Sequence, residues 1–147
     1  MNPMILCIGN RDSGDDAIGP YIADKISTQQ NEYIVIDCGT VPENYTALVK
    51  QHKPETLLII DAADMGLPPG EIRIIPQHKI GVMHISTHGI PLSVLYTYLK
   101  KYSKNILIIG IQPQTMSVKL STAVQKSGDR LIIFLKTHTY TKIPILQ

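Results

Sequence analysis

Two consecutive carboxylates, Asp15 and Asp16, stand where a glycine-rich loop follows an apolar run and enters a helical pattern. The glycines at positions 9 and 14 have the spacing of a phosphate-binding P-loop, in which Lys and then Ser or Thr follow the second glycine. Here two acids follow instead, and they would repel phosphate. The dinucleotide fingerprint fails as well, because the third glycine lies at position 19. The loop therefore favours a cation.

A structural explanation exists for one of these two acids. A carboxylate that caps a helix is favoured there by the helix macrodipole, and either residue fits that role. Two acids in succession leave one to spare, and we assign Asp16 a metal-binding or catalytic role.

Two further acids, Asp37 and Asp61, follow short apolar runs that are typical of buried parallel strands. Ligands of open α/β sheets bind beyond the carboxyl ends of the strands, so both acids should emerge at the edge that carries Asp16. A half-buried carboxylate needs a cation or hydrogen bonds to offset its lost hydration. Neighbouring loop amides explain Asp37 as well as a ligand does, whereas a ligand is the better explanation for Asp61.

The histidines add one candidate ligand. His84 and His88 are four residues apart, but the residues between and after them oppose a helix, and the Glu of the helical zinc-protease motif is missing. His88 instead reads as a loop histidine that precedes a helix. Together with Asp16 and Asp61 it makes a nitrogen and oxygen ligand set suited to nickel, zinc or a similar divalent ion, with coordination positions left open.

The two cysteines make no disulfide framework. Cys7 lies within an apolar run and is expected in the core. Cys38 follows Asp37 at the end of another run and is expected to be partly exposed. This opens a rival mechanism, a thiol hydrolase with Cys38 as nucleophile and His88 as base.

The elements that must position these residues alternate along the chain. Strands are predicted at Met4–Ile8, Tyr33–Ile36, Thr56–Ile60, Ile106–Ile111 and, as an alternating edge strand, Glu71–Ile75. Helical patterns begin near Pro20, Pro42 and Pro91 and after Ser121, a plausible N-cap. Strands alternating with helices predict an α/β three-layer sandwich, a mostly parallel five-stranded sheet with helices on both faces.

Bulk composition sets further limits. A length of 147 residues fits one domain, and 44% hydrophobic content suits a packed core. The sequence has neither a membrane-length apolar run nor the features of a signal peptide, so we expect a cytoplasmic protein without membrane contact. Residues 96–147 hold eight Lys or Arg against one acid, Asp129. A solvated helical face explains this better than an acidic partner does, and nucleic acid is less favoured because no aromatic stacking pattern accompanies the bases.

Several ordered motifs, spread from Ile5 to about Val124, resemble the hydrogenase maturation endopeptidases. They are Gly9-Asn10, Gly14-Asp-Asp-Ala-Ile-Gly-Pro20, Asp37-Cys-Gly-Thr40, Pro42-Glu-Asn44, Ile60-Asp-Ala-Ala-Asp-Met-Gly66, Pro69-Gly-Glu-Ile-Arg-Ile-Ile75, Ser86-Thr-His-Gly-Ile-Pro-Leu92 and Gly110-Ile-Gln-Pro113. The pattern is most similar to the subgroup that serves formate-hydrogenlyase-type and deazaflavin-reducing hydrogenases. The stretch after about Lys136 follows no family pattern, and we expect it to be partly disordered after residue 137.

The resemblance implies a twisted, mixed sheet and a nickel-dependent, aspartic-type endopeptidase. Such an enzyme removes the C-terminal extension of a [NiFe]-hydrogenase large-subunit precursor after nickel insertion. Asp16, Asp61 and His88 match the nickel-recognising positions, although many members have Glu in place of Asp16. The stretch Asp37, Cys38, Gly39 and Thr40 matches one linked to substrate recognition.

The same resemblance leaves several points open. We expect a monomer that binds the precursor and holds nickel weakly or not at all on its own, since the substrate carries the metal. Asp16, Asp37 or a metal-bound water remains open as the group that delivers the hydrolytic attack. A non-enzymatic nickel-binding or precursor-binding maturation factor is the second rival.

Overall fold

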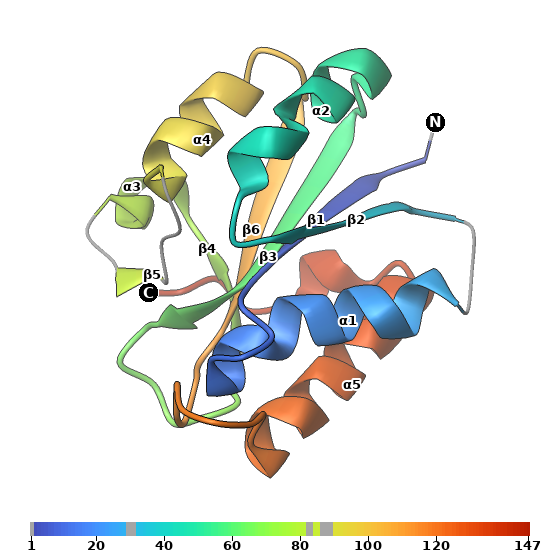
Figure 1. The fold of residues 1–147 in the computed structure, drawn as a ribbon. Helices are drawn as coiled ribbons and strands as arrows, with labels where there is room; N and C mark the ends of the chain where they lie inside the picture. Colours follow the sequence, from blue (N-terminus) through green and yellow to red (C-terminus); the bar gives the residue numbers. More distant parts are fainter. Residues whose placement is uncertain (1, 29–31, 82–83, 86–89) are drawn as a thin grey trace.

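The computed structural model describes residues 2–28, 32–81, 84–85 and 90–147 (Figure 1). Its central sheet has the order β2-β1-β3-β6-β4, in which β4 is antiparallel to β6 and the other neighbours are parallel. The strands are β1 (Met4–Ile8), β2 (Ile34–Gly39), β3 (Thr56–Asp64), β4 (Ile72–Ile75) and β6 (Asn105–Ile111). This confirms the predicted five-stranded, mostly parallel, mixed sheet with residues 71–75 at its edge, and it shows that this edge strand is antiparallel. A two-residue strand not predicted from the sequence, β5 (His84–Ile85), pairs with the end of β3.

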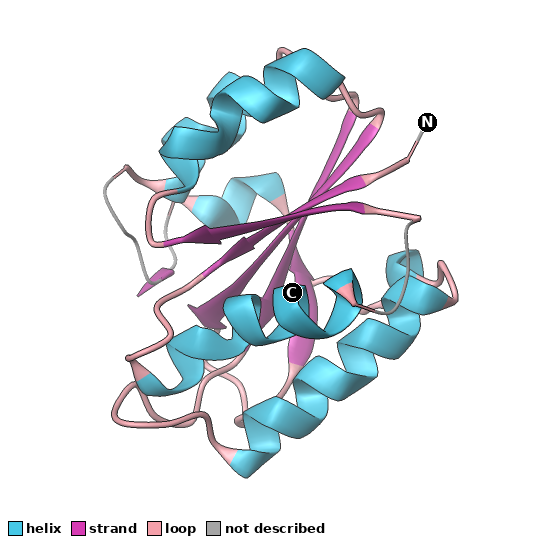
Figure 2. Cartoon of the chain, turned by 45° about the vertical axis from the view of Figure 1, so that its right-hand side comes forward, coloured by secondary structure: helices cyan, strands magenta, loops and turns pink. Residues whose placement is uncertain are grey.

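Helices cover both faces of the sheet, as Figures 1 and 2 show. One layer contains α1 (Ile18–Ser27) and α5 (Thr122–Lys136), and the other contains α2 (Thr46–His52) and α4 (Leu92–Leu99). The shorter elements are the 3-10 turns η1 (Gly14–Ala17), η2 (Pro42–Tyr45) and η3 (Tyr140–Lys142) and the one-turn helix α3 (Gln77–Ile80). None of the helices in the described ranges combines the length and apolarity that a membrane crossing requires.

Two apolar cores lie on opposite faces of the sheet, which is why the strands read as unbroken apolar runs. Along β3, Leu58 and Ile60 belong to the core under α1 and α5, whereas Leu57 and Ile59 belong to the core under α2 and α4. Alternate side chains of a strand point to opposite faces, so a strand covered on both sides needs apolar residues at every position. The predicted three-layer sandwich is therefore confirmed.

The strand register brings Asp37 of β2, and Ile60 just before Asp61 in β3, level with the end of β1. Cys7 of β1 pairs with Asp37 of β2 on one side and with Ile60 of β3 on the other. β3 continues to Asp64, beyond the predicted end at Ile60, because its pairing with β6 runs on through Ala62. Asp61 is consequently a residue within the strand, not the first residue after it.

The expectation of a partly disordered tail after residue 137 is wrong. Ile143 and Leu146 are buried, with 2% and 9% of their surface exposed. The backbone nitrogen of Leu146 donates to the Ile74 carbonyl over 2.9 Å, and Ile145 forms a parallel bridge with Ile74 in β4. The tail is ordered because its apolar residues cover the open edge of β4, a contact that its polar beginning, Thr-His-Thr-Tyr-Thr-Lys, does not reveal.

A buried carboxylate pair at the carboxyl edge of the sheet

Asp16 lies in η1, directly after the loop that leaves β1, and only 1% of its surface is exposed. Its Oδ2 accepts a hydrogen bond from the backbone nitrogen of Asn10 at 2.9 Å. The loop must fold tightly to place it there: a Cβ at Gly9 would lie 1.9 Å from the Asp16 carbonyl oxygen, and one at Gly19 would lie 2.1 Å from that of Ile8. These two glycines of the motif therefore allow the backbone approach that buries Asp16.

Asp61 is 2% exposed, and its Oδ1 accepts a hydrogen bond from the backbone nitrogen of Ala62 at 2.8 Å. Burial raises the pKa of Asp61 well above its usual range, and the negative charge of Asp16 raises it further. The structure thus brings together two of the three residues expected to face nickel. Two buried carboxylates that lie close together repel each other. The repulsion is relieved when one of them takes up a proton or when a cation binds beside them.

The third expected ligand, His88, lies outside the described residues, as does the side chain of His84. Its place in the site stays a prediction from the sequence. Within the described part of the chain, no three His, Cys, Asp or Glu side chains are grouped so as to hold a metal ion.

Asp15 has a different task from Asp16, although the two are adjacent. Its side chain is fully buried and accepts four hydrogen bonds, all from the segment between β6 and α5. The donors are the backbone nitrogens of Gln114 (2.7 Å), Thr115 (3.0 Å) and Ser121 (2.6 Å) and the Ser121 hydroxyl (2.9 Å). Neither acid makes a side-chain capping bond to its own turn, so the capping explanation is replaced by a long-range one.

The stretch from Asp37 to Thr40 joins this edge through Arg11. The Arg11 guanidinium pairs with Asp37 at 2.5 Å and with both carboxylate oxygens of Asp24 at 2.7 and 2.9 Å. The other oxygen of Asp37 accepts from the Gly39 backbone nitrogen at 3.2 Å, and the Gly39 carbonyl accepts from Gly9 at 2.9 Å. The end of β2 is therefore tied to the loop that carries Asp16.

Cys38 is not partly exposed as expected, because only 1% of its surface is accessible. Burial and the charges of Asp37, Asp61 and Glu43 raise the pKa of the thiol to about 12. A cysteine nucleophile acts as the thiolate, which this site disfavours. The thiol-hydrolase alternative loses its physical basis here.

Gln112, in the motif after β6, organises the loop that follows β3. Its side-chain oxygen accepts from the backbone nitrogens of Met65 (2.6 Å) and Leu67 (3.3 Å), and its amide nitrogen donates to Asp64 (3.2 Å). The sequence motif marks the position, but sequence reasoning assigned it no role because these partners lie more than forty residues away.

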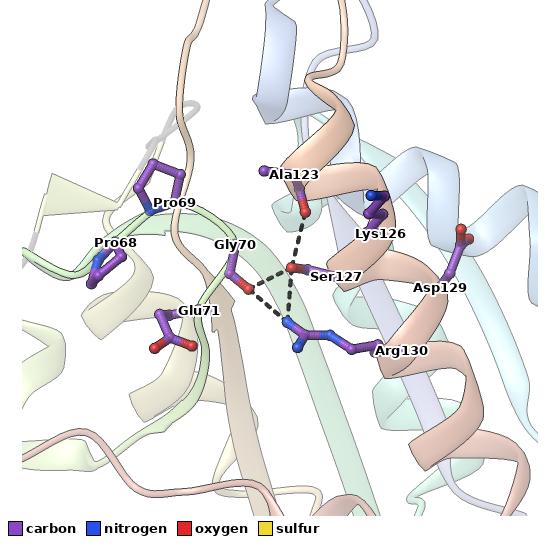
Figure 3. Close-up of a pocket in the computed structure, with 9 residues that line it drawn as sticks. All are labelled: Pro68, Pro69, Gly70, Glu71, Ala123, Lys126, Ser127, Asp129 and Arg130. Carbon is purple, nitrogen blue, oxygen red and sulfur yellow. Dashed lines mark hydrogen bonds between the residues drawn. The ribbon is translucent and has the colours of Figure 1, made fainter.

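An open pocket of about 690 Å³ lies between residues 68–71 and α5. Figure 3 shows the side chains that line it. At its wall the Gly70 carbonyl accepts hydrogen bonds from the Ser127 hydroxyl and from Arg130 at 3.1 Å. A Cβ at Gly70 would lie 2.8 Å from the Ser127 oxygen, so this contact requires glycine. The pocket includes none of the predicted site residues, and its polar groups fasten the loop after β3 to α5.

Comparison with known proteins shows to which family the chain belongs. The HycI hydrogenase maturation protease family matches residues 20–137. Hydrogenase 3 maturation protease of Escherichia coli K12 is 43% identical over 115 residues, covering 77% of this chain and 74% of that one. The chain belongs to the hydrogenase maturation protease family.

Other relatives agree with this protease assignment. A putative hydrogenase maturation protease of Methanocaldococcus jannaschii is 39% identical over 140 residues, covering 88% of this chain and 83% of that one. The solution structure of the endopeptidase HycI from Escherichia coli superposes with a TM-score of 0.89 at 33% identity, over 100% of this chain and 97% of that one. Our hydrogenase maturation protease thus shares the endopeptidase fold along its whole length.

Proposed function

We propose that this protease removes the C-terminal extension of a [NiFe]-hydrogenase large-subunit precursor after nickel insertion, and that it recognises the nickel which the precursor carries. One observation supports this most strongly: Asp16 and Asp61 are buried beside each other at the carboxyl edge of the sheet. The pair lies at the carboxyl edge of the sheet, where open α/β sheets bind ligands, and a cation there would stabilise both carboxylates in their charged form.

In this proposal the precursor brings the nickel, so the metal is part of the substrate. Asp16 and Asp61 supply oxygen ligands and His88 supplies a nitrogen, a set suited to nickel, and they complete a coordination sphere of which the precursor already provides half. Cleavage then depends on metal insertion, because an empty precursor brings no cation to offset the repulsion between the acids. Weak nickel binding by the isolated protease follows from the same division of ligands.

Hydrolysis requires a water molecule to attack the scissile carbonyl carbon while the nitrogen of the leaving segment gains a proton. Of the three candidates that the sequence left open for activating this water, Asp16 and a metal-bound water remain, because Asp37 has another role. Both oxygens of Asp37 already accept hydrogen bonds, from Arg11 and from Gly39, which gives Asp37 the role of fixing the Asp37–Thr40 stretch.

One experiment separates this proposal from its rivals. Purified protein is incubated with nickel-loaded precursor and, in parallel, with nickel-free precursor, and both products are weighed by mass spectrometry. We expect the extension to be lost only from the loaded form. Binding without a change in mass would indicate a non-enzymatic maturation factor, and equal cleavage of both forms would refute nickel recognition.

A further inference from the structure

Met65, just after the end of β3, fills the space beside Asp61 on the side that faces β6. Asp61 pairs with Gly110 of β6, and the paired residues two positions earlier, Ile59 and Ile108, both belong to the core under α2 and α4. Because side chains alternate along a strand, Asp61 and Gly110 face that same side of the sheet. A Cβ on Gly110 would lie 3.3 Å from the Met65 Sδ. Met65 therefore takes the place that a side chain at residue 110 would occupy, next to Asp61.

Gln112 fixes the backbone of Met65 in this place. The Gln112 side chain is buried, with 7% of its surface exposed, and its Oε1 accepts from the Met65 nitrogen at 2.6 Å and from the Leu67 nitrogen at 3.3 Å. Its amide nitrogen donates to Asp64 at 3.2 Å, and its backbone carbonyl accepts from the Gly70 nitrogen at 2.8 Å. One residue thus holds the chain on both sides of Met65, which restricts how far Met65 can move away from Gly110.

Repulsion between the two acids gives this packing a function. Asp16 lies in η1, which follows β1, and its negative charge raises the pKa of Asp61. In the sheet β1 and β6 flank β3 on opposite sides. Repulsion from Asp16 therefore drives the Asp61 carboxylate toward β6. The bare backbone of Gly110 would give the carboxylate room to turn in that direction, but the Met65 side chain takes up this room.

We propose that Met65 and Gln112 are positioning residues of the protease: Met65 prevents the Asp61 carboxylate from turning away from Asp16, and Gln112 holds Met65 in place. The inference rests on the proposed function, because it explains how Asp61 is kept at the edge where the precursor's nickel is recognised. A carboxylate that must meet a metal ion needs surrounding residues that fix its orientation, and loose support costs activity even when the carboxylate itself is present.

The test changes the side chain beside Asp61 and leaves both acids intact. Met65→Ala opens the space, whereas Met65→Leu keeps a side chain of similar volume. The matched control is Ile106→Ala, because Ile106 is partly buried against the same core as Met65 but lies near the start of β6, away from Gly110. Three quantities are measured for each protein: the χ1 rotamer of Asp61 in the free protein, from NMR three-bond couplings, kcat/KM on a nickel-loaded [NiFe]-hydrogenase large-subunit precursor, and the melting temperature.

We expect one Asp61 rotamer in the wild type and in Met65→Leu, and a changed or averaged rotamer in Met65→Ala. In Met65→Ala, kcat/KM should fall about 10- to 100-fold, the effect of a misplaced reacting group. Ile106→Ala should lower the melting temperature but keep the Asp61 rotamer, with kcat/KM within about twofold of the wild type. Gln112→Ala should reproduce the effects of Met65→Ala, and the double variant should lose no more than about twofold further, because both residues act through one contact.

A wild-type Asp61 rotamer in Met65→Ala would overturn the proposal. An equal loss of kcat/KM in Ile106→Ala would overturn it too, because general destabilisation would then explain the effect. A wild-type rotamer and rate in Gln112→Ala would remove Gln112 from the positioning role. If the Asp61 rotamer changes in Met65→Ala but wild-type protein never cuts the nickel-loaded precursor, the proposed protease reaction is refuted and the positioning of Asp61 stands.

Discussion

Asp15 and Asp16 are neighbours in sequence and equally buried, yet their surroundings differ in kind. Asp15 lies among four hydrogen-bond donors of the β6–α5 segment, which replace the water it has lost. Asp16 lies in the field of a second carboxylate, Asp61, whose pKa it raises. Asp15 is thus surrounded by donors, whereas Asp16, which accepts a hydrogen bond from the Asn10 nitrogen, also has a second carboxylate close to it.

The difference teaches how a single loop can combine stability with a reactive site. A buried carboxylate is tolerated either when donors surround it or when a cation arrives from outside. Because Asp15 anchors η1 from one side, Asp16 can be held beside Asp61 without the turn rearranging to relieve the repulsion. The fold thus places an unfavourable pair of carboxylates, Asp16 and Asp61, next to the favourable hydrogen bonds of Asp15.

The largest effect is expected on cleavage when the charge of Asp16 is removed. Asp16→Asn keeps the side-chain shape but weakens the proposed interaction with the precursor's nickel, so processing should fall by about 10²–10³-fold or more. The rate is measured by mass spectrometry of the precursor, and circular dichroism should show an unchanged fold. Normal processing by this variant would show that Asp16 has no functional role that distinguishes it from Asp15.

Asp15 should show the opposite pattern, a loss of stability first. Asp15→Ala leaves three partly buried backbone N–H groups without their acceptor, and we expect a decrease of roughly 3 kcal/mol in the free energy of unfolding. Urea denaturation measures it. The control is Asp12→Ala, an exposed acid of the same loop, for which a change within about 0.5 kcal/mol is expected. Equal effects of the two substitutions would show that Asp15 does not anchor the segment.

The pH dependence of stability sharpens the role of Asp61. Its pKa is raised in the folded state, so its protonated form favours folding: this contribution is complete below the unfolded pKa and is lost as the pH rises through the folded pKa. Asp61→Asn should therefore be more stable than the wild type at neutral pH, by a margin that shrinks as the pH falls toward the ordinary carboxyl range. Urea unfolding of both proteins across pH values measures the margin. A constant margin would mean that folding does not raise the pKa of Asp61.

The smallest effect is expected at Cys38. Burial raises the pKa of its thiol to about 12, which disfavours the thiolate, and serine replaces it with a side chain of nearly the same shape. Cys38→Ser should cleave the precursor at a rate within about twofold of the wild type. Complete inactivity with an intact fold would instead support a cysteine nucleophile.

Much of the fold could be predicted because local patterns and long-range packing agree. The apolar run at Met4–Ile8 matches β1 residue for residue, and Ser121 was identified as an N-cap whose hydroxyl indeed accepts from the Val124 nitrogen at 3.4 Å. Such signals depend on a few adjacent residues. The end of β3 was placed too early because Asp61 looks like a terminator until its pairing with Gly110 is known.

The site was predictable only in part, for reasons of distance along the chain. The placement of Asp16 and Asp61 at one edge of the sheet could be predicted, because the carboxyl ends of parallel strands meet at the same edge. The role of Asp15 depends on donors about a hundred residues away, and nothing in the local sequence distinguishes it from Asp16. The burial of Cys38 likewise arises from packing against the core beneath α2 and α4. His88 remains a prediction, as it lies outside the described residues.

The final residues that run along β4 have a protective effect. An uncovered edge strand offers unpaired backbone groups to any neighbouring chain and so promotes sheet-to-sheet aggregation. Here Pro144 and Leu146 take up both backbone groups of Ile74, while Ile143 and Leu146 fill the adjoining hollow. A variant truncated after residue 142 would expose the edge of β4 and aggregate through it, even though the acid pair is intact. Loss of activity caused by that aggregation would say nothing about catalysis.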